Sequence, residues 1–155
     1  MAEIVQRLVS THESAHETPQ EMSPDMSTRA ACQDILATLL ERTHATLFAS
    51  LATVDGRSYA HAGSGLSTTS AQRSAAITSS LMGLIESFSK ESLNSGALYN
   101  SIATEKGSIV IVRVPSKARL HTLCVCADAT ANLAMTIRAA LDTAQKLADR
   151  IDAPR

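Results

Sequence analysis

Apolar residues recur with a strand-like period over residues 98–128. Residues 108–114 form an almost unbroken β-branched run, and such side chains fit a pleated strand better than a helix. Turns flank this run, because Lys106-Gly107 supplies a glycine and Pro115 cannot donate to a strand ladder. The pattern predicts three consecutive antiparallel strands over residues 98–103, 108–114 and 119–127.

The middle strand of these three is apolar on both faces. Ile109 and Ile111 share one parity, whereas Val110, Val112 and Val114 share the other. A strand that is apolar on both sides is covered on both sides. The remaining chain is therefore expected to supply helices to both faces of one sheet.

Two stretches with the helical period lie outside this strand region, near the two ends of the sequence. Residues 28–42 can be capped by Ser27 or Thr28, and their apolar stripe is formed by Cys32, Ile35, Leu36, Leu39 and Leu40. A C-terminal helix can be capped by Asp128 or Thr130, and its stripe is formed by Leu133, Ile137, Leu141, Ala144, Ala148 and Ile151.

A third helix is predicted to open with a capping box at Thr69 and Gln72 and to continue to residue 89. Gly83 costs about 1 kcal/mol relative to alanine in a helix interior, so we expect another backbone to approach closely there. The main apolar stripe of this helix is formed by Ile77, Leu81, Leu84, Ile85 and Phe88.

A strand–turn–strand unit precedes this helix. Asp55-Gly56 is a strong hairpin signal, and it separates strands predicted over residues 46–53 and 57–62. The second strand is polar on one face, which is typical of an edge strand that avoids pairing with other chains. The predicted element order is α-β-β-α-β-β-β-α, an α+β fold.

Residues 1–27 are predicted to be an N-terminal extension, and residues 28–152 the domain. Ile4, Val5, Leu8 and Val9 have helical spacing, and a polar, proline-containing linker follows them. Two interpretations stay open: a frayed tail, or an amphipathic clip that docks onto the domain or a partner.

Composition narrows the function classes for these 155 residues. A net charge of −1 without a basic stripe argues against nucleic acid as a partner. No apolar run approaches the roughly 18 residues of a membrane span, and the N-terminus does not resemble a secretory signal. Three cysteines without a framework spacing suit a reducing compartment, so we expect a cytoplasmic protein.

The candidate chemical motifs are incomplete. Cys124 and Cys126 share one face of a strand, while His121 has the opposite parity; core packing is the main interpretation, with a metal or redox pair as the alternative. Gly63-Ser-Gly65 lacks the remaining residues of a phosphate-binding loop. No catalytic triad spacing occurs. The sequence therefore predicts no catalytic residue, no cofactor and no metal site.

With these elements in place, the chain resembles the roadblock/LC7 family, in its bacterial members, over residues 28–151. The resemblance rests on ILATLLERT, TLFASLATVDGRSYAHAG, the capped middle helix and SIVIVRVPSKARLHTLCVCADATANLAMTIRAAL. It implies a five-stranded antiparallel sheet in the order 2-1-5-4-3, with the middle helix on one face and the first and last helices on the other.

The resemblance also implies a homodimer that pairs the third strand with its symmetry mate and packs the middle helices together. The residues that this places at the dimer interface are Ile77, Ser80, Leu81, Leu84, Phe88, Leu98, Tyr99, Asn100, Ser101, Ile102 and Ala103. An apolar edge strand left unpaired would be an aggregation hazard, which independently favours a covered edge.

Functionally, the resemblance implies a non-catalytic adaptor, scaffold or regulator that acts on or beside a Ras-like small GTPase or in a signalling complex. The alternative is a small-molecule-binding sensor domain, or a scaffold subunit without a GTPase partner. No arginine finger is identified: Arg57, Arg73, Arg113 and Arg119 are available, but each is better explained as a surface charge.

Overall fold

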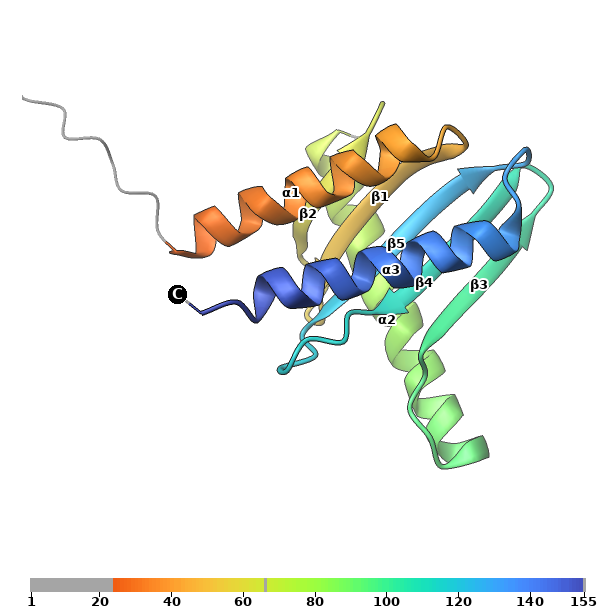
Figure 1. Cartoon of the computed structure of the whole chain (residues 1–155). Helices are drawn as coiled ribbons and strands as arrows, with labels where there is room; N and C mark the ends of the chain where they lie inside the picture. Colours follow the sequence, from red (N-terminus) through yellow and green to blue (C-terminus); the bar gives the residue numbers. More distant parts are fainter. Residues whose placement is uncertain (1–23, 66, 155) are drawn as a thin grey trace, which may run out of the picture.

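The computed structural model describes residues 24–65 and 67–154. Its elements follow the predicted order (Figure 1): α1 (Pro24–Arg42), β1 (Thr46–Thr53), β2 (Ser58–Gly63), α2 (Thr68–Leu93), β3 (Tyr99–Thr104), β4 (Gly107–Arg113), β5 (His121–Asp128) and α3 (Leu133–Ile151). The strands form one antiparallel sheet in the order β2-β1-β5-β4-β3. The predicted fold class and strand order are confirmed.

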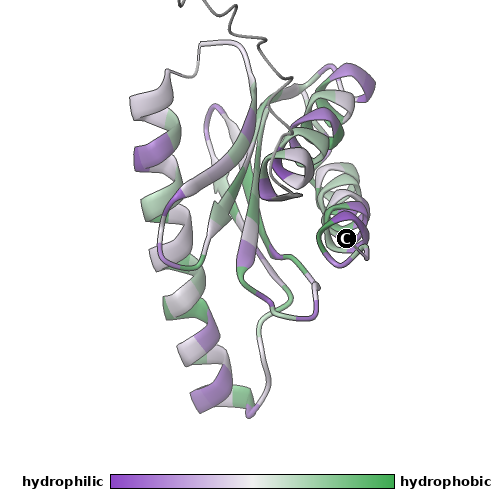
Figure 2. Cartoon of the chain, turned by 90° about the vertical axis from the view of Figure 1, so that its left-hand side faces the viewer, coloured by the Kyte–Doolittle hydropathy of each residue, from purple (hydrophilic) through white to green (hydrophobic). Residues whose placement is uncertain are grey.

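The molecule has three layers. Figure 2 shows α2 on one side of the sheet and α1 and α3 together on the other. The strand parities explain this arrangement: Val110, Val112 and Val114 belong to the core beneath α1 and α3, whereas Ile111 belongs to the core beneath α2. The predicted burial of β4 on both faces is therefore correct.

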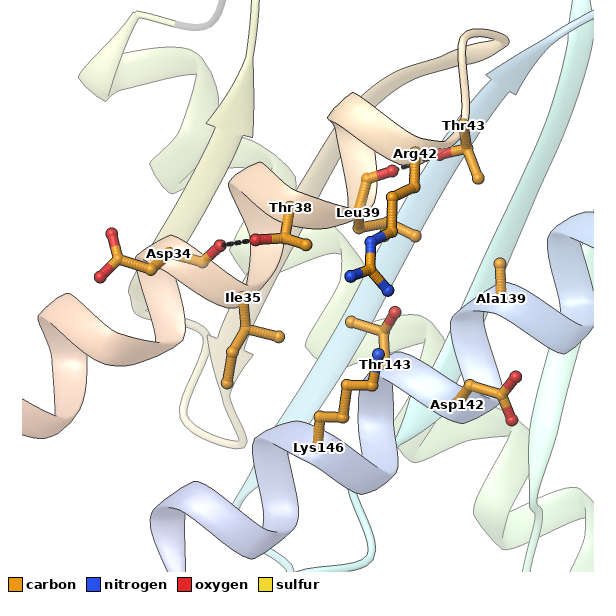
Figure 3. A pocket seen from close by; sticks show the side chains of 10 residues that line it. All are labelled: Asp34, Ile35, Thr38, Leu39, Arg42, Thr43, Ala139, Asp142, Thr143 and Lys146. Atoms are coloured by element: carbon orange, nitrogen blue, oxygen red, sulfur yellow. Dashed lines mark hydrogen bonds between the residues drawn. The ribbon is translucent and has the colours of Figure 1, made fainter.

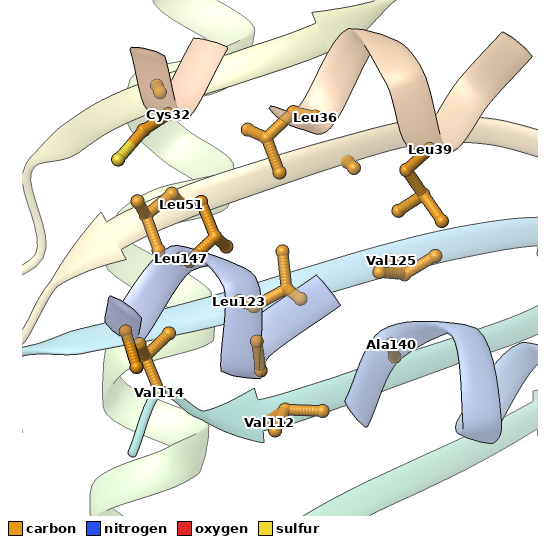
Figure 4. Close-up of a cluster of buried hydrophobic side chains, with 14 of the residues drawn as sticks. Cys32, Leu36, Leu39, Leu51, Val112, Val114, Leu123, Val125, Ala140 and Leu147 are labelled. Carbon is orange, nitrogen blue, oxygen red and sulfur yellow. The ribbon is translucent and has the colours of Figure 1, made fainter. Parts of the chain in front are cut away.

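The larger core joins α1, α3 and the sheet, and its interior is aliphatic (Figure 4). Leu36 of α1, Leu123 of β5 and Leu147 of α3 are fully buried there. The core under α2 is smaller and is made of Met82, Ala97, Ile111, Cys124 and Cys126. The face of the sheet covered by α2 thus buries fewer apolar residues than the face covered by α1 and α3.

Helix starts differ from the sequence predictions. α1 begins at Pro24, so Ser27 and Thr28 lie inside the helix instead of capping it. A proline is well suited to the first turn, because its fixed φ is already helical and its missing N–H has no helical partner there. Asp25 follows in the same turn, where a carboxylate opposes the positive end of the helix dipole.

The other two caps also shift by a few residues. Ser67 caps α2, accepting from the Ser70 N–H (3.1 Å), so the predicted Thr69–Gln72 box does not form. Asn132 caps α3 by accepting from the Met135 N–H (3.2 Å). In each case a polar side chain nearby in sequence occupies the capping position in place of the predicted one.

The predicted amphipathic segment at residues 4–9 lies outside the described residues. Within the part of the chain that the structure describes, no helix is long and apolar enough to cross a membrane.

Candidate functional site

The sheet has two edge strands, β2 and β3, and side chains of the helices hydrogen-bond to the outer side of one of them. At β2, the Gln33 side chain donates to the His61 carbonyl and accepts from the His61 N–H (3.0 Å). Arg29 donates to the carbonyls of Tyr59 and Ser58, the latter at 2.8 Å. α1 therefore hydrogen-bonds to the outward backbone groups of β2 that another strand would need for pairing. We call β2 the blocked edge.

Gln72 of α2 completes the blocked edge at the start of β2. Its amide donates to the Gly56 carbonyl (2.9 Å) and accepts from the Ser58 N–H (3.1 Å). This contact is why Gln72 is not available for the predicted capping box. The Gln72 side chain does hydrogen-bond to backbone, but that backbone belongs to the hairpin that precedes α2 and not to the start of α2.

The opposite edge is β3, and it has no such cover. Among the described residues, no side chain hydrogen-bonds to the backbone of residues 99–103. β3 pairs on its inner side with β4 in a regular register from Tyr99↔Val112 to Thr104↔Gly107. Its outer side presents backbone groups that a further strand can pair with, and we call β3 the open edge.

Apolar side chains gather beside the open edge. Ile77, Leu84 and Phe88 of α2 have 61%, 69% and 71% of their surface exposed. Leu98 and Tyr99, at the start of β3, are also exposed large hydrophobic residues. Exposed apolar residues that cluster in this way mark an interaction surface more often than single ones do.

None of the residues of the predicted dimer interface is fully buried in the protomer. The exposed residues are Ile77, Ser80, Leu84, Phe88, Leu98, Tyr99, Ser101 and Ala103. The partly buried residues are Leu81, Asn100 and Ile102. The alternative role as intrachain core therefore applies at most to this second group.

Leu93 belongs to the same surface, with 77% of its area exposed, and was not among the predicted residues. The predicted helix stops at residue 89, but α2 continues to Leu93 and ends on Asn94 in a left-handed conformation (φ 50°). Asn94 was the available signal, because asparagine tolerates this conformation at helix ends.

A groove of about 420 Å³ separates α2 from the sheet next to the open edge. We call it the α2 groove. Apolar side chains from α2, β1, β3 and β4 form its walls: Phe48, Ile77, Leu81, Ile102, Ile109 and Ile111. Arg73 lies on the same lining, and the thiols of Cys124 and Cys126 face it from β5.

A charge cluster ties the far half of α2 to the sheet. Glu86 lies 3.7 Å from Arg113 of β4 and 3.8 Å from Lys90, measured between carboxylate oxygen and nitrogen. Arg113 also donates to the Thr122 hydroxyl (3.0 Å). Arg113 is therefore used internally, which argues against it as an arginine finger.

A second groove lies on the other side of the sheet, between α1 and α3 (Figure 3). Its volume is about 310 Å³, and its walls include Ile35, Leu39 and Ala139. The side chains of Arg42 and Lys146 extend over it from the two helices. Neither cation forms an ion pair with any described residue, and the groove contains no nucleophile with a base beside it.

The predicted chemical motifs do not assemble into a catalytic site. His121 packs edge-on against the Tyr59 ring (centroids 4.9 Å apart), and burial lowers the pKa of its imidazole. Within residues 24–65 and 67–154, no group of three or more His, Cys, Asp or Glu residues could hold a metal ion. The candidate functional site is the surface made of the open edge, the exposed face of α2 and the α2 groove.

No protein-family model matches the sequence, and no curated protein matches it. Solved structures do match. A roadblock/LC7 domain from Streptomyces avermitilis has a TM-score of 0.70 at 19% identity, covering 78% of this chain and 98% of that chain. The gliding protein MglB from Thermus thermophilus has a TM-score of 0.69 at 14% identity, covering 80% of this chain and 90% of that chain.

Another MglB structure, described as having a tetrameric arrangement, has a TM-score of 0.70 at 16% identity and covers 80% of this chain and 90% of that chain. At these identities the similarity establishes the fold. The chain has the roadblock/LC7 fold, as the resemblance of its sequence implied.

Proposed function

We propose that this chain is a non-catalytic adaptor or regulator that forms a homodimer through β3 and α2 and acts on or beside a Ras-like small GTPase. The dimer proposal rests on the difference between the two edge strands of the sheet. The blocked edge is closed by side chains of the same protomer, whereas the open edge is bordered by exposed apolar residues.

Self-pairing satisfies the open edge most simply. Two copies of β3 related by a two-fold axis run antiparallel, so each supplies the backbone partners that the other lacks. The same axis brings the two α2 helices together on one face of the joined sheet. Most soluble oligomers have closed symmetry of this kind, and it leaves no open edge behind.

The outer face of α2 fits a helix partner. Ile77, Leu84 and Phe88 recur at the spacing of one helical stripe, so they form a continuous apolar contact surface. A Cβ built on Gly83 would meet no atom within 4 Å, so the close approach expected at this glycine is not made within the protomer. A second α2 is the element that we propose there.

The GTPase part of the proposal has a separate basis. It rests on the resemblance of the sequence to a family whose bacterial members work beside small GTPases, and on the fold shared with MglB. A partner that binds the paired α2 helices would recognise both protomers together. We therefore expect GTPase binding to require the dimer.

Light scattering on purified protein tests the dimer. Wild type is expected to have twice the protomer mass, and Leu84→Asp the protomer mass, because the charge would be buried against the symmetry mate. Met135→Asp is the matched control: Met135 is also 69% exposed but lies on α3, behind the opposite face of the sheet. Dimeric Leu84→Asp, or monomeric Met135→Asp, would refute the proposed interface.

Affinity capture tests the GTPase. Wild type and Leu84→Asp are immobilised and exposed to lysate of the source organism with GDP or a non-hydrolysable GTP analogue. We expect a small GTPase to be enriched on wild type in one nucleotide state and lost on Leu84→Asp. Absence of any GTPase in both states, with an intact dimer, would reject the GTPase partner while leaving the dimer in place.

A further inference from the structure

The groove between α1 and α3 lies on the face of the sheet opposite α2 (Figure 3). Ile35, Leu39 and Ala139 give it an apolar lining. A further cavity of about 440 Å³ continues from it along α3, because the two share Thr43, Ala139 and Asp142. We call this continuous hollow the α1–α3 groove.

The α1–α3 groove has the length of a short helix. Its α1 wall runs from Asp34 to Thr43, which is about 14 Å at 1.5 Å per helical residue. An amphipathic helix that docks in such a groove places its apolar stripe on the lining and its polar side chains at the rim. A helix of about two turns therefore fits.

The charged side chains along the groove are only partly paired within the protomer. Asp142 forms an ion pair with Arg138 (3.4 Å). Asp34, Arg42 and Lys146 form none with any described residue. A complementary occupant therefore brings acidic groups to the two cations and a basic group to Asp34.

The segment at residues 4–9 of this chain has the matching pattern. Its apolar residues recur at helical spacing, and they are Ile4, Val5, Leu8 and Val9. Glu3 and Arg7 are four positions apart, about one helical turn, so the segment has a charge of each sign. Three more glutamates follow before α1, so residues 1–23 are acidic overall: Glu13, Glu17 and Glu21.

The connection to α1 is long enough and favours one orientation. Residues 10–23 are 14 residues that span up to about 46–50 Å when extended, whereas Pro24 and Asp34 are about 15 Å apart along α1. The shortest path enters the groove at its Asp34 end, so the segment would run antiparallel to α1. Arg7 then lies toward Asp34, and Glu3 lies toward Arg42.

We propose that residues 4–9 dock as a helix in the α1–α3 groove of their own protomer, antiparallel to α1. Their apolar stripe covers Ile35, Leu39 and Ala139, and the ion pairs Glu3–Arg42 and Arg7–Asp34 set the direction. The docking does not depend on the proposed dimer, because the groove and α2 lie on opposite faces of the sheet.

Limited trypsin digestion of the full-length protein tests the docking. We expect the bond after Arg7 to be cut about tenfold more slowly in wild type than in Ala139→Gln, whose longer side chain would fill the groove. The cleaved sequence is identical in both proteins, so the rate reports the docking. Ala134→Gln is the matched control, because Ala134 is exposed on α3 and lines neither cavity, and it should keep the wild-type rate.

Methyl NMR on full-length protein with labelled isoleucine and leucine identifies the contacts. We expect nuclear Overhauser effects from Leu8 to Ile35 and Leu39 in wild type, and their loss in Ala139→Gln. Leu8→Asp changes no residue of the folded domain, and it should shift the Ile35 and Leu39 resonances while leaving that of Ile111, on the other face of the sheet, in place.

Three results would overturn the docking. The first is equal cleavage after Arg7 in wild type and in an Ala139→Gln protein that circular dichroism shows to be folded. The second is contact of Leu8 with Ile102 or Ile109 of the α2 groove in place of Ile35 and Leu39. The third is loss of the contacts on dilution or in Leu84→Asp, which would mean that a second copy holds the segment.

Discussion

The two edges of this sheet meet the same physical demand in different ways. Each edge strand has backbone N–H and C=O groups on its outer side that need hydrogen-bond partners. At β2 the protomer provides them itself, through Arg29 and Gln33 of α1 and Gln72 of α2. At β3 no described side chain does so, and apolar residues border the strand instead.

The two edges differ in whether one protomer alone satisfies their backbone groups. A side chain that pairs with an edge strand excludes other strands, so the β2 side is finished within one protomer. In the proposed dimer, a second β3 supplies the missing partners on the β3 side. This difference supports the proposed self-association through β3, and the following changes alter one edge at a time.

The largest effect is expected from a charge at the open edge. Ile102 is partly buried at the α2 groove, and in the proposed dimer Ile102→Asp would place a carboxylate in each of two facing protomers. We expect complete loss of the dimer at micromolar concentration. Sedimentation velocity measures this, with circular dichroism to verify folding and Ile102→Val as a control that should remain dimeric.

A smaller effect is expected when the blocked edge is opened. Gln33→Ala removes two hydrogen bonds to the His61 backbone and should lower the free energy of unfolding by about 1–2 kcal/mol. The freed strand should also permit assemblies larger than the dimer at high concentration. Gln145→Ala, which removes an exposed contact to Asp149 on α3, is the control and should change neither property.

Gly83→Ala should move the protomer and the dimer in opposite directions. Alanine is favoured over glycine in a helix interior by about 1 kcal/mol, so the protomer should gain stability of that order. In the dimer, the added methyl groups would separate the two helices and weaken association. Urea unfolding in the Leu84→Asp background isolates the first effect; tighter association of Gly83→Ala would contradict helix packing at this position.

The smallest effect concerns pH. Burial lowers the pKa of His121 below its ordinary value near 6.5, while Asp25 acts in the opposite direction. Above pH 6.5 the histidine is neutral in the folded and the unfolded state, so its burial does not lower the free energy of unfolding. As pH falls through 6.5 the unfolded state gains the proton first, and stability is lost. His121→Phe, which keeps an aromatic ring beside Tyr59, should have a flatter pH dependence of unfolding.

Much of the fold followed from the sequence, because local patterns and burial agreed. The double-sided apolar pattern of residues 109–112 required helices on both faces of the sheet, and α1, α2 and α3 provide them. The hairpin predicted at Asp55-Gly56 was also correct, and Gly56 has a positive φ of 82° there, although Asp55 does not.

The difference between the blocked edge and the open edge was less predictable from the sequence. The polar face of β2 indicated an edge strand, but the residues that block it are 14 to 30 positions away along the chain. Gln33 and Arg29 look like ordinary exposed residues of an amphipathic helix until the helix is placed over β2. At Gln72 the local capping pattern competed with a tertiary contact, and the tertiary contact prevailed.

Backbone amide hydrogen exchange, measured at several protein concentrations, is the decisive test of the difference between the two edges, because it reads both edges in one sample. We predict that the amides of β2 exchange slowly at every concentration, since their partners belong to the same protomer. The outward-facing amides of residues 99–103 should exchange slowly above the dimer dissociation constant and quickly below it or in Leu84→Asp. Protection of these β3 amides that does not change with concentration or in that variant would contradict the open edge.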